Sequence, residues 1–571
     1  MNKHGIFHIP EAPFAYGINE NTLYIKIRVA AKDIKSVKLY CKDRYNWDGS
    51  FPCYEMEKII SSELFDYFKA EVKVREKRFR YFFKIIDNNN EEVYLNEKGL
   101  QKEIPNEGGA FQFPYIALGD LYREVKWPQE GIAYQIFPDR FFNGNKSNDP
   151  KDVMKWGEEV TTRNFFGGDI KGITEKLDYI KDLGVTFIYM TPIFKSSSNH
   201  KYNTCDYYEI DEMFGTKEEF RELIKEAHKR EIKIILDGVF NHTGADFFAF
   251  KDLIEKGEKS KYKDWFFVED YPVDLEKINY VTFANKVKYM PKINMNNKDT
   301  RNYFLNVAKY WIEELDIDGW RLDVCDEVDH LFWREFREAV KSVKEDAFII
   351  GEIMHQGRNF LKGEELDSIM NYPFREASLD FFAKRTIDAK KLNDILMEKK
   401  AWSMESINRQ MLNLLDSHDT ARFLTDSDGN IDRLKLAVVF QYTFEGIPYI
   451  YYGDEIGMKG ETDPYCRRCM VWDEEKQNID LKNHFKKLGK IRKENKELIY
   501  GKYNSLIKDK FLLVYERVLG DEKSLIIINN DLTSKEVEIC GKFKDLYENK
   551  HLEINNKILI NPMDFKILKA K

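Results

Sequence analysis

The chain has 571 residues, of which 43% are hydrophobic and 33% charged, a globular composition that excludes a disordered or fibrous chain. Its 90 Lys and Arg residues against 98 Asp and Glu residues give a formal charge of −8, so no global attraction draws nucleic acid or an anionic membrane to it. At roughly 150 residues per domain, this length predicts about three or four domains.

Four segments near the N-terminus alternate apolar and polar residues, and short turns separate them. They are Thr22–Val29, Ser36–Cys41, Phe65–Val74 and Phe79–Ile86. This alternation, with many β-branched and aromatic residues, is typical of half-buried strands. We therefore predict an N-terminal β-sandwich over residues 1–122.

From residue 123 to about residue 495, short apolar runs alternate with helical patterns such as Ile173–Leu183, Lys217–Arg230 and Arg301–Leu315. Eight strand–helix units predict a (β/α)8 barrel of the α/β class, with its active site at the carboxyl ends of the strands. The eight expected strands are Ala133–Phe137, Val185–Met190, Ile232–Val239, Gly319–Val324, Phe348–Glu352, Ser368–Asn371, Met411–Asp416 and Pro448–Tyr452.

Two further parts complete the expected organisation. Residues 244–298, after the third strand, are too many for a simple loop, so we expect an inserted subdomain there. Strand patterns return in residues 496–571, which predicts a C-terminal all-β domain.

The seven cysteines are odd in number and scattered, which indicates a reducing compartment rather than a disulfide framework. Cys466 and Cys469 form a C-x-x-C without a second pair or a histidine cluster, so zinc is not expected. The first residues lack an apolar leader, and charged residues and a proline interrupt the apolar run Leu434–Tyr452. We predict a soluble cytoplasmic protein.

Polar side chains follow four of the predicted barrel strands. Asp237 ends the third strand, Arg321 and Asp323 the fourth, Glu352 the fifth, and Asp419 follows the seventh. Any one of these carboxylates alone is more simply a capping or solvated group. A barrel brings all of these positions to one pit, however, and proteins accept crowded carboxylates mainly at functional sites.

Arg321 and Asp323 are two residues apart on a strand and so face the same side. We expect the guanidinium to lower the pKa of Asp323 and keep it an ionised nucleophile. Glu352 has no cation at an adjacent position and follows an apolar strand, so desolvation should favour its protonated form, as a general acid needs. Such a pair defines acid and nucleophile at a glycosidic bond.

In this order, these segments resemble the α-amylase superfamily of retaining glycoside hydrolases, and Gly131–Phe141 looks like the family's first strand. The resemblance implies Asp323 as nucleophile, Glu352 as acid/base and Asp419 as a third carboxylate that grips the sugar. It also implies contacts to sugar hydroxyls and charged groups from Arg321, His242 and His418, support from Asp237, and a ring platform from Tyr202.

The finer resemblance is to the cyclomaltodextrinase, neopullulanase and maltogenic amylase branch. The N-terminal β domain, Met290–Asn294 and Glu327–His330 carry it, and Asp463 and Arg467 look like the branch's contacts to deeper sugars. The branch implies hydrolysis of α-1,4-glucosidic bonds in cyclodextrins, pullulan and short maltooligosaccharides, with some transglycosylation. It also implies a homodimer formed through the N-terminal domain.

The sequence departs from the branch pattern at two places near the catalytic residues. Met354 stands where the branch carries Trp, and Cys325-Asp326 stands where Ala-Asn is commoner. The first departure removes a ring, and the second adds a carboxylate three residues after Asp323.

A second site lies in the first two barrel loops. Its residues supply the oxygen ligands that suit calcium: Asn143, Asn145, Asn148, Asp149, Gly167 and Asp169. An ordinary Asn/Gly turn is the plain alternative. Resemblance to the branch's calcium loop favours a structural Ca²⁺ that braces the barrel rim.

Two other functions would fit parts of this pattern. An oligo-α-glucosidase or 4-α-glucanotransferase would use the same three carboxylates, although the sandwich domain and Met290–Asn294 argue against it. A non-catalytic amylase-like binding protein would lack catalytic carboxylates, whereas all three are present.

Overall fold

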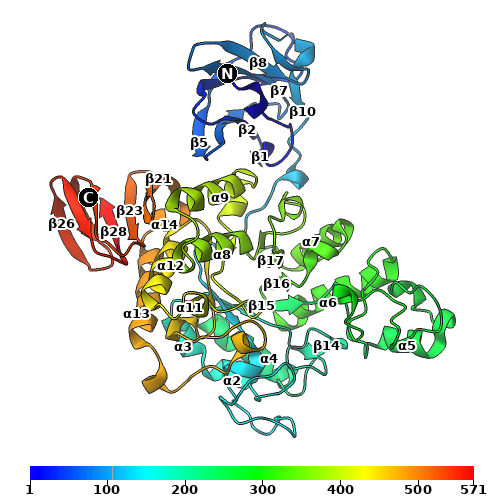
Figure 1. Cartoon of the computed structure of the whole chain (residues 1–571). Coiled ribbons are helices and arrows are strands. Elements are labelled where there is room, and N and C mark those ends of the chain that lie inside the picture. The colour runs from blue at the N-terminus through cyan, green and yellow to red at the C-terminus, as the bar shows by residue number, and fades with distance from the viewer. Residues whose placement is uncertain (106, 571) are drawn as a thin grey trace. The chain divides into compact units, whose positions relative to one another are not determined.

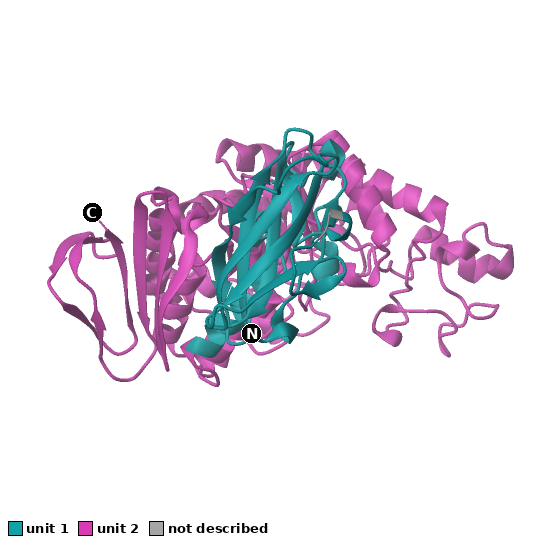
Figure 2. Ribbon diagram, turned by 90° about the horizontal axis from the view of Figure 1, so that it is seen from above, with its two compact units in different colours: residues 1–124, 358–364, 390–408 teal, residues 125–357, 365–389, 409–571 magenta. Residues whose placement is uncertain are grey.

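A computed structural model describes residues 1–105 and 107–570 (Figure 1). The chain forms two compact units, coloured separately in Figure 2. The first comprises residues 1–124, 358–364 and 390–408, and the second comprises residues 125–357, 365–389 and 409–571. Within the described ranges, no helix has the length and apolar character needed to cross a membrane.

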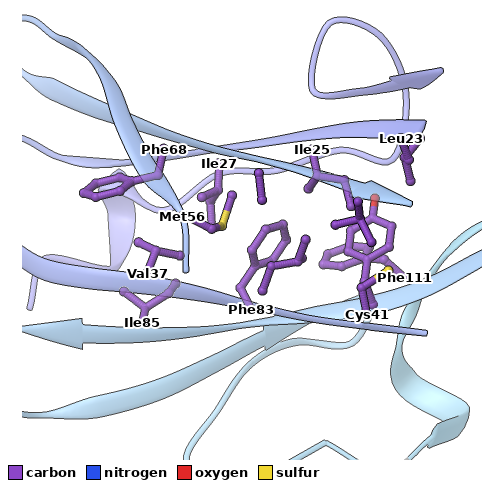
Figure 3. Close-up of a cluster of buried hydrophobic side chains, with 14 of the residues drawn as sticks. Leu23, Ile25, Ile27, Val37, Cys41, Met56, Phe68, Phe83, Ile85 and Phe111 are labelled. Carbon is purple, nitrogen blue, oxygen red and sulfur yellow. The ribbon is translucent and has the colours of Figure 1, made fainter. Parts of the chain in front are cut away.

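The first unit contains the predicted β-sandwich, made of two antiparallel sheets. Alternate residues of each strand face inward, so Ile25 and Ile27 of one sheet meet Phe83 and Ile85 of the other in a buried core (Figure 3). One sheet has the order β1 (Ala15–Asn19), β2 (Thr22–Ala30), β6 (Phe65–Lys73), β5 (Glu57–Ser61). The other has the order β4 (Cys53–Glu55), β3 (Ile34–Asp43), β7 (Phe79–Asp87), β8 (Glu92–Asn96), β9 (Gly99–Gln101), with β10 (Phe111–Phe113) paired to β7.

Two distant segments join the sandwich in the first unit. Residues 390–408 contain most of α9 (Ala389–Ala401) and all of α10 (Glu405–Asn408). The buried Lys26 Nζ donates a hydrogen bond to the Ala401 carbonyl at 2.6 Å, and Trp402 packs edge-on against Phe14 with ring centroids 5.2 Å apart. The first compact unit therefore includes residues that lie far from the N-terminal segment in the sequence.

The second unit contains an eight-stranded parallel barrel, which confirms the predicted fold. Its apolar strands are buried on both faces, as the near-continuous hydrophobic runs require. A parallel bridge between Met370 and Leu412 joins the two outer strands and closes the ring. The strand order is β18 (Ser368–Ile369), β17 (Phe348–Gly351), β16 (Gly319–Leu322), β15 (Lys233–Gly238), β12 (Phe187–Met190), β11 (Ala133–Ile136), β20 (Ile447–Tyr451), β19 (Leu412–Asn413).

Helices connect the barrel strands, and α13 and α14 follow the last of them. The expected helix Ile173–Leu183 is divided at Lys176 into two short helices, α2 and α3. A capping box between Thr216 and Glu219 begins α4. The helices are α1 (Pro138–Phe141), α2 (Ile170–Glu175), α3 (Leu177–Asp182), α4 (Lys217–Lys229), α6 (Lys298–Leu315), α7 (His330–Val343), α8 (Tyr372–Ser378), α11 (Phe423–Asp426), α12 (Ile431–Thr443), α13 (Ile479–Glu494) and α14 (Glu497–Tyr500).

The insertion after β15 forms a lobe with its own aromatic packing. It contains α5 (Phe248–Lys256) and three short 3₁₀ helices, and Figure 1 shows α5 in a lobe that extends away from β15 and β16. Phe250 contacts Phe266 and Tyr280 with ring centroids 4.9 and 5.1 Å apart. A backbone bridge between His242 and Lys292 ties the lobe to the end of β15.

The C-terminal all-β part of the second unit is also as predicted, and its strands enclose a small apolar core that includes Leu525, Ile527 and Leu568. A two-stranded sheet pairs β24 (Lys535–Glu538) with β27 (Lys557–Ile560). The main sheet has the order β21 (Lys502–Asp509), β22 (Leu512–Leu519), β23 (Glu522–Asn529), β28 (Asp564–Ala570), β25 (Gly541–Asp545), β26 (Lys550–Ile554).

Candidate active site

The carboxyl ends of the barrel strands meet at one cavity of about 500 Å³. The strand register places Asp237 of β15 beside Arg321 of β16, and Arg321 beside Ile350 of β17. Seven of the ten predicted catalytic and sugar-contact residues line the cavity directly: Tyr202, His242, Asp323, Glu352, Asp419, Asp463 and Arg467. The other three are buried and contact members of this set: Asp237, Arg321 and His418.

The fully buried guanidinium of Arg321 binds three carboxylates. Its Nη1 lies 3.0 Å from Asp237 Oδ2 and 2.8 Å from Asp323 Oδ1, and its Nη2 lies 2.7 Å from Glu352 Oε1. A buried cation with several anionic partners fixes their positions, because separating any of them would leave an uncompensated charge. Arg321 therefore sets the spacing between Asp323 and Glu352.

Two sequence expectations about this cluster are wrong. Glu352 does not lack a cation, because the long side chain of Arg321 reaches across to the neighbouring strand. The pKa of Asp323 is not lowered: burial and the nearby Glu352 carboxylate raise it well above its usual range, and Arg321 only partly opposes them. One guanidinium shared among three carboxylates cannot offset the desolvation of all of them.

Asp237 supports the same conclusion about the charge of the cluster. Burial raises the pKa of Asp237 to about 6, although Arg321 opposes the shift and the hydroxyls of Tyr189 and Tyr202 donate to its Oδ2 at 2.6 and 3.0 Å. The pKa of Asp323 is raised as well, so burial and mutual repulsion oppose the simultaneous ionisation of the clustered carboxylates.

A chain of hydrogen bonds fixes the ring of Tyr202. Gln135 Nε2 donates to His418 Nδ1 at 2.7 Å, so His418 Nε2 carries the proton and donates to the Tyr202 hydroxyl at 2.5 Å, which in turn donates to Asp237. Burial lowers the pKa of His418 well below its usual range and keeps the ring neutral. The parallel rings of Tyr202 and His418 stack with centroids 5.5 Å apart. Tyr202 is thus positioned as a rigid aromatic wall of the cavity.

Asp419 is tied to the loop after β20 through Arg467. Arg467 Nη2 lies 3.0 Å from Asp419 Oδ1, and Arg467 Nη1 lies 3.1 Å from Asp463 Oδ1. The neighbouring Cys466 is buried, and its thiol donates to the His418 carbonyl at 3.1 Å. All seven cysteines are free thiols, and this one anchors the loop that carries Arg467.

Val324 is a functional position that sequence reasoning missed. It follows Asp323 with φ = 43°, a left-handed conformation that strains a β-branched residue. In this conformation its backbone N–H donates to Glu352 Oε2 at 3.0 Å. A sequence gives no signal for this arrangement, because glycine is the residue normally expected at positive φ.

Further lining residues were also not assigned to the site from sequence. His200 lies two residues before Tyr202, and this closeness in sequence could have indicated that it also belongs to the site. Phe283 and Met290 come from the inserted lobe, and no sequence pattern assigned them to the site. Phe283 stacks on His242 with ring centroids 4.9 Å apart. The two departures from the branch pattern also reach the cavity, since Asp326 and Met354 line it.

His242 presents an unused donor to the cavity. Asn241 Nδ2 contacts its Nδ1 at 3.3 Å, which leaves the proton on Nε2. That buried Nε2 has no hydrogen-bond partner in residues 1–105 and 107–570. Burial lowers the pKa of His242 to about 3, so the ring is neutral and can donate to a ligand hydroxyl.

The predicted calcium residues also gather in one place. The buried Oδ1 atoms of Asn143 and Asn148 accept no hydrogen bond within the described part of the chain, and Asn143 Nδ2 donates to Asp149 Oδ1 at 2.7 Å. Gly167 has φ = 76° and lies so close to Asp149 Oδ1 that a Cβ would be 2.3 Å from it. Orphaned amide oxygens beside a carboxylate suit a hard cation.

The two remaining predicted ligands have hydrogen-bond partners of their own. Asn145 Oδ1 accepts from Ser147. The carboxylate of Asp169 accepts from the backbone N–H groups of Gly144, Asn145 and Gly172, and it caps α2. Asn143, Asn148 and Asp149 are therefore the residues that best fit a cation.

Comparison with known proteins gives consistent matches. Residues 135–506 match the family described as the alpha amylase catalytic domain, and residues 1–117 match the alpha amylase N-terminal Ig-like domain. The chain is 48% identical to a cyclomaltodextrinase of Thermoanaerobacter pseudethanolicus over 100% of both chains, and 44% identical to neopullulanase 2 of Thermoactinomyces vulgaris over 93% of this chain and 91% of that one. A solved cyclomaltodextrinase structure superposes with a TM-score of 0.95 at 38% identity, covering 100% of both chains.

Proposed function

The chain belongs to the α-amylase family, and from that membership we propose that it is a retaining glycoside hydrolase of the cyclomaltodextrinase type that cleaves α-1,4-glucosidic bonds. The observation that carries the proposal is the shared guanidinium of Arg321, which bridges Asp323 and Glu352. Two carboxylates on one planar group suit the separation of roughly 5–5.5 Å of retaining enzymes better than the roughly 6.5–9.5 Å of inverting ones.

In the proposed mechanism, Asp323 attacks the anomeric carbon while Glu352 donates its proton to the departing glycosidic oxygen. The C–O bond to the leaving sugar breaks, and a glycosyl ester forms on Asp323. Glu352, now a carboxylate, then takes a proton from water, whose oxygen attacks the same carbon and releases Asp323. Two inversions give a product of α configuration.

The residues around the pair are suited to a neutral, hydroxyl-rich substrate. His242 Nε2–H is free to donate to a hydroxyl, Tyr202 supplies a ring face, and the Asp463 carboxylate supplies acceptors. These groups, with the names of the similar proteins, support cyclodextrins, pullulan and short maltooligosaccharides as substrates and some transfer to sugar acceptors.

We expect kcat/KM for γ-cyclodextrin to exceed that for soluble starch at least severalfold. The proposed reason is a homodimer formed through the N-terminal sandwich, in which each copy narrows the cleft of its partner. Initial rates and product analysis on γ-cyclodextrin, pullulan and starch test the preference, and sedimentation tests the dimer. A clear preference for long starch would refute the cyclomaltodextrinase type while leaving α-1,4 hydrolysis intact.

The same product analysis distinguishes the alternative enzymes. An oligo-α-glucosidase releases glucose from chain ends and leaves closed cyclodextrin rings intact, whereas a 4-α-glucanotransferase gives mainly longer and shorter glucans. A non-catalytic binding protein gives no products at all. The presence of Asp323, Glu352 and Asp419 at one cavity supports a catalytic protein.

We also propose that Ca²⁺ binds at Asn143, Asn148 and Asp149. Chelation should lower the melting temperature by roughly 2–5 °C, and added calcium should restore it, because a ligand that binds only the folded state stabilises by mass action. Scanning calorimetry with and without chelator measures the effect, and Asn148→Ala should lose the response to calcium. An unchanged melting curve would indicate that residues 143–149 form an ordinary turn without bound calcium.

We also propose that the protein is located in the cytoplasm. All seven cysteines are free, and Cys41, Cys325, Cys466 and Cys469 are buried. Thiols that form no disulfide are the rule where glutathione and thioredoxin keep the compartment reducing.

A further inference from the structure

An ion pair in the catalytic cavity joins two loops of the barrel. Asp419 lies in the loop after β19 and Arg467 in the loop after β20, and Arg467 Nη2 is 3.0 Å from Asp419 Oδ1. Both residues line the cavity, and Asp419 is in a turn rather than in a strand. The position of its carboxylate in the cavity therefore depends on how firmly the two loops are fixed to each other.

Arg422 connects the same two loops from behind the cavity. It lies three residues after Asp419 and is fully buried. Its backbone N–H donates to the Gly460 carbonyl at 2.9 Å, its Nε donates to the Cys466 carbonyl at 3.1 Å, and its Nη1 lies 2.7 Å from Asp454 Oδ1. All three acceptors belong to the loop after β20. Because a planar guanidinium holds its donors in fixed directions, one side chain sets the spacing between the loops.

The Cys466 carbonyl belongs to the peptide bond that leads into Arg467, and it accepts a second hydrogen bond. The Tyr451 hydroxyl donates to it at 3.2 Å, and the ring of Tyr451 has the Arg422 guanidinium 4.3 Å from its centroid. The next carbonyl, that of Arg467 itself, accepts from Arg140 Nη1 at 3.0 Å. The backbone of Arg467 is thus held on both sides, which fixes the direction in which its side chain extends toward the cavity.

Arg422 keeps its positive charge in this buried position. Burial opposes the charge, but the nearby Asp454 carboxylate raises the pKa of Arg422 above its usual range. Burial and the nearby Asp416 in turn raise the pKa of Asp454 well above its usual range, and Arg422 opposes that shift. Removing the cation would leave buried carboxylates without their positive partner, which lowers stability for a reason unrelated to catalysis. A variant that keeps the charge is therefore the informative one.

We propose that Arg422 is a positioning residue for the reaction: by fixing the loop after β20 to the loop after β19, it holds Arg467, and through it Asp419, in the orientation that stabilises the transition state. The inference rests on the proposed α-1,4-glucan hydrolysis with Asp419 as the third carboxylate. Arg422 is buried and does not line the cavity, so it acts through Arg467 rather than on the sugar. Displacing a group that acts mainly in the transition state lowers kcat more than it changes KM.

The test uses Arg422→Lys, which keeps the positive charge beside Asp454 but has no Nε donor for the Cys466 carbonyl. On γ-cyclodextrin, kcat should fall by roughly 10- to 100-fold while KM stays within about threefold of the wild-type value. A milder variant is Tyr451→Phe, which removes only the second donor to the same carbonyl and keeps the ring against Arg422. It should lower kcat by roughly two- to fivefold.

Arg517→Lys is the matched control for the loss of a buried guanidinium. Arg517 is fully buried in β22, and its Nη1 and Nη2 donate to the carbonyls of Thr443 and Gly501 at 2.6 and 2.9 Å. None of these three residues lines the catalytic cavity. This control should also lower the melting temperature, yet its kcat should stay within about twofold of the wild-type value.

A double-mutant cycle with Asp419→Asn separates positioning from general damage. The substrate is dinitrophenyl maltoside, whose activated leaving group keeps low rates measurable. Arg422→Lys should lower kcat at least about tenfold when Asp419 is present, but less than about twofold in the Asp419→Asn background. Equal losses in both backgrounds, or an unchanged kcat in Arg422→Lys, would overturn the proposal.

Two further points make the outcome decisive. If Arg422→Lys does not fold, the same cycle with Tyr451→Phe replaces it, and a loss of equal size in the presence and absence of Asp419 would again contradict the positioning role. Failure of this inference is distinct from failure of the proposed function, because hydrolysis of γ-cyclodextrin by the wild-type enzyme tests that function independently.

Discussion

Asp323→Ala should abolish turnover of every substrate, with kcat reduced by roughly 10⁴- to 10⁶-fold. The variant has no group that can form the glycosyl ester, because Asp237, the other carboxylate on Arg321 Nη1, is buried and does not line the cavity. Initial rates on γ-cyclodextrin, measured as reducing ends released, check the loss. The isosteric Asp323→Asn should be equally inactive, because an amide is a poor nucleophile.

The stability of Asp323→Ala provides the control. Burial and the nearby carboxylates make the ionised form of Asp323 costly, so removing that group should not lower the melting temperature. A large fall in melting temperature would mean that lost activity reports unfolding. Proton NMR of the first products of the wild-type enzyme should show the α anomer, and a β product or an active Asp323→Ala enzyme would overturn the assignment.

Glu352→Gln should lose roughly 10³-fold in kcat on γ-cyclodextrin, because a sugar leaving group needs the proton that Glu352 supplies. The first step with a dinitrophenyl maltoside should be largely spared, since that phenolate leaves without protonation. Glutamine can still accept from Val324 N, so the geometry around the side chain is conserved. Stopped-flow measurement should show a rapid burst of dinitrophenolate followed by slow turnover.

The burst is expected because Glu352 also acts as the general base in the second step of the proposed mechanism. Without a general base, water attacks the glycosyl ester on Asp323 slowly, and the ester accumulates. Added azide, a nucleophile that needs no base, should accelerate the second phase and give an α-glycosyl azide. If Glu352→Gln lost as much on the activated substrate as on γ-cyclodextrin, Glu352 would not be the acid/base.

Much of the architecture could be predicted from local sequence patterns. The period-2 alternation in Thr22–Val29 and Phe79–Ile86 reports one buried face, and eight apolar runs between helical patterns report strands covered on both faces. Given a barrel, topology alone brings the residues that end its strands to one mouth. This is why Asp323, Glu352 and Asp419 could be placed in one site without coordinates.

The electrostatics of that site depended on the tertiary structure. The sequence predicted a lowered pKa for Asp323 from its neighbour Arg321, but the structure shows one guanidinium divided among Asp237, Asp323 and Glu352. A pKa sums desolvation and every nearby charge, and these terms come from strands that are distant in sequence. The closeness of Arg321 and Asp323 along one strand reveals only one of these contributions to the pKa of Asp323.

Sequence alone determined the order of strands and helices, the barrel and the identity of the polar groups at its mouth, because each depends on short-range periodicity and a general rule of topology. Only the tertiary structure decided how far side chains reach. It showed Arg321 crossing to Glu352, and the left-handed Val324 turning its N–H to the same carboxylate. Each is a contact between segments far apart in the chain, whose formation depends on packing that no local pattern encodes.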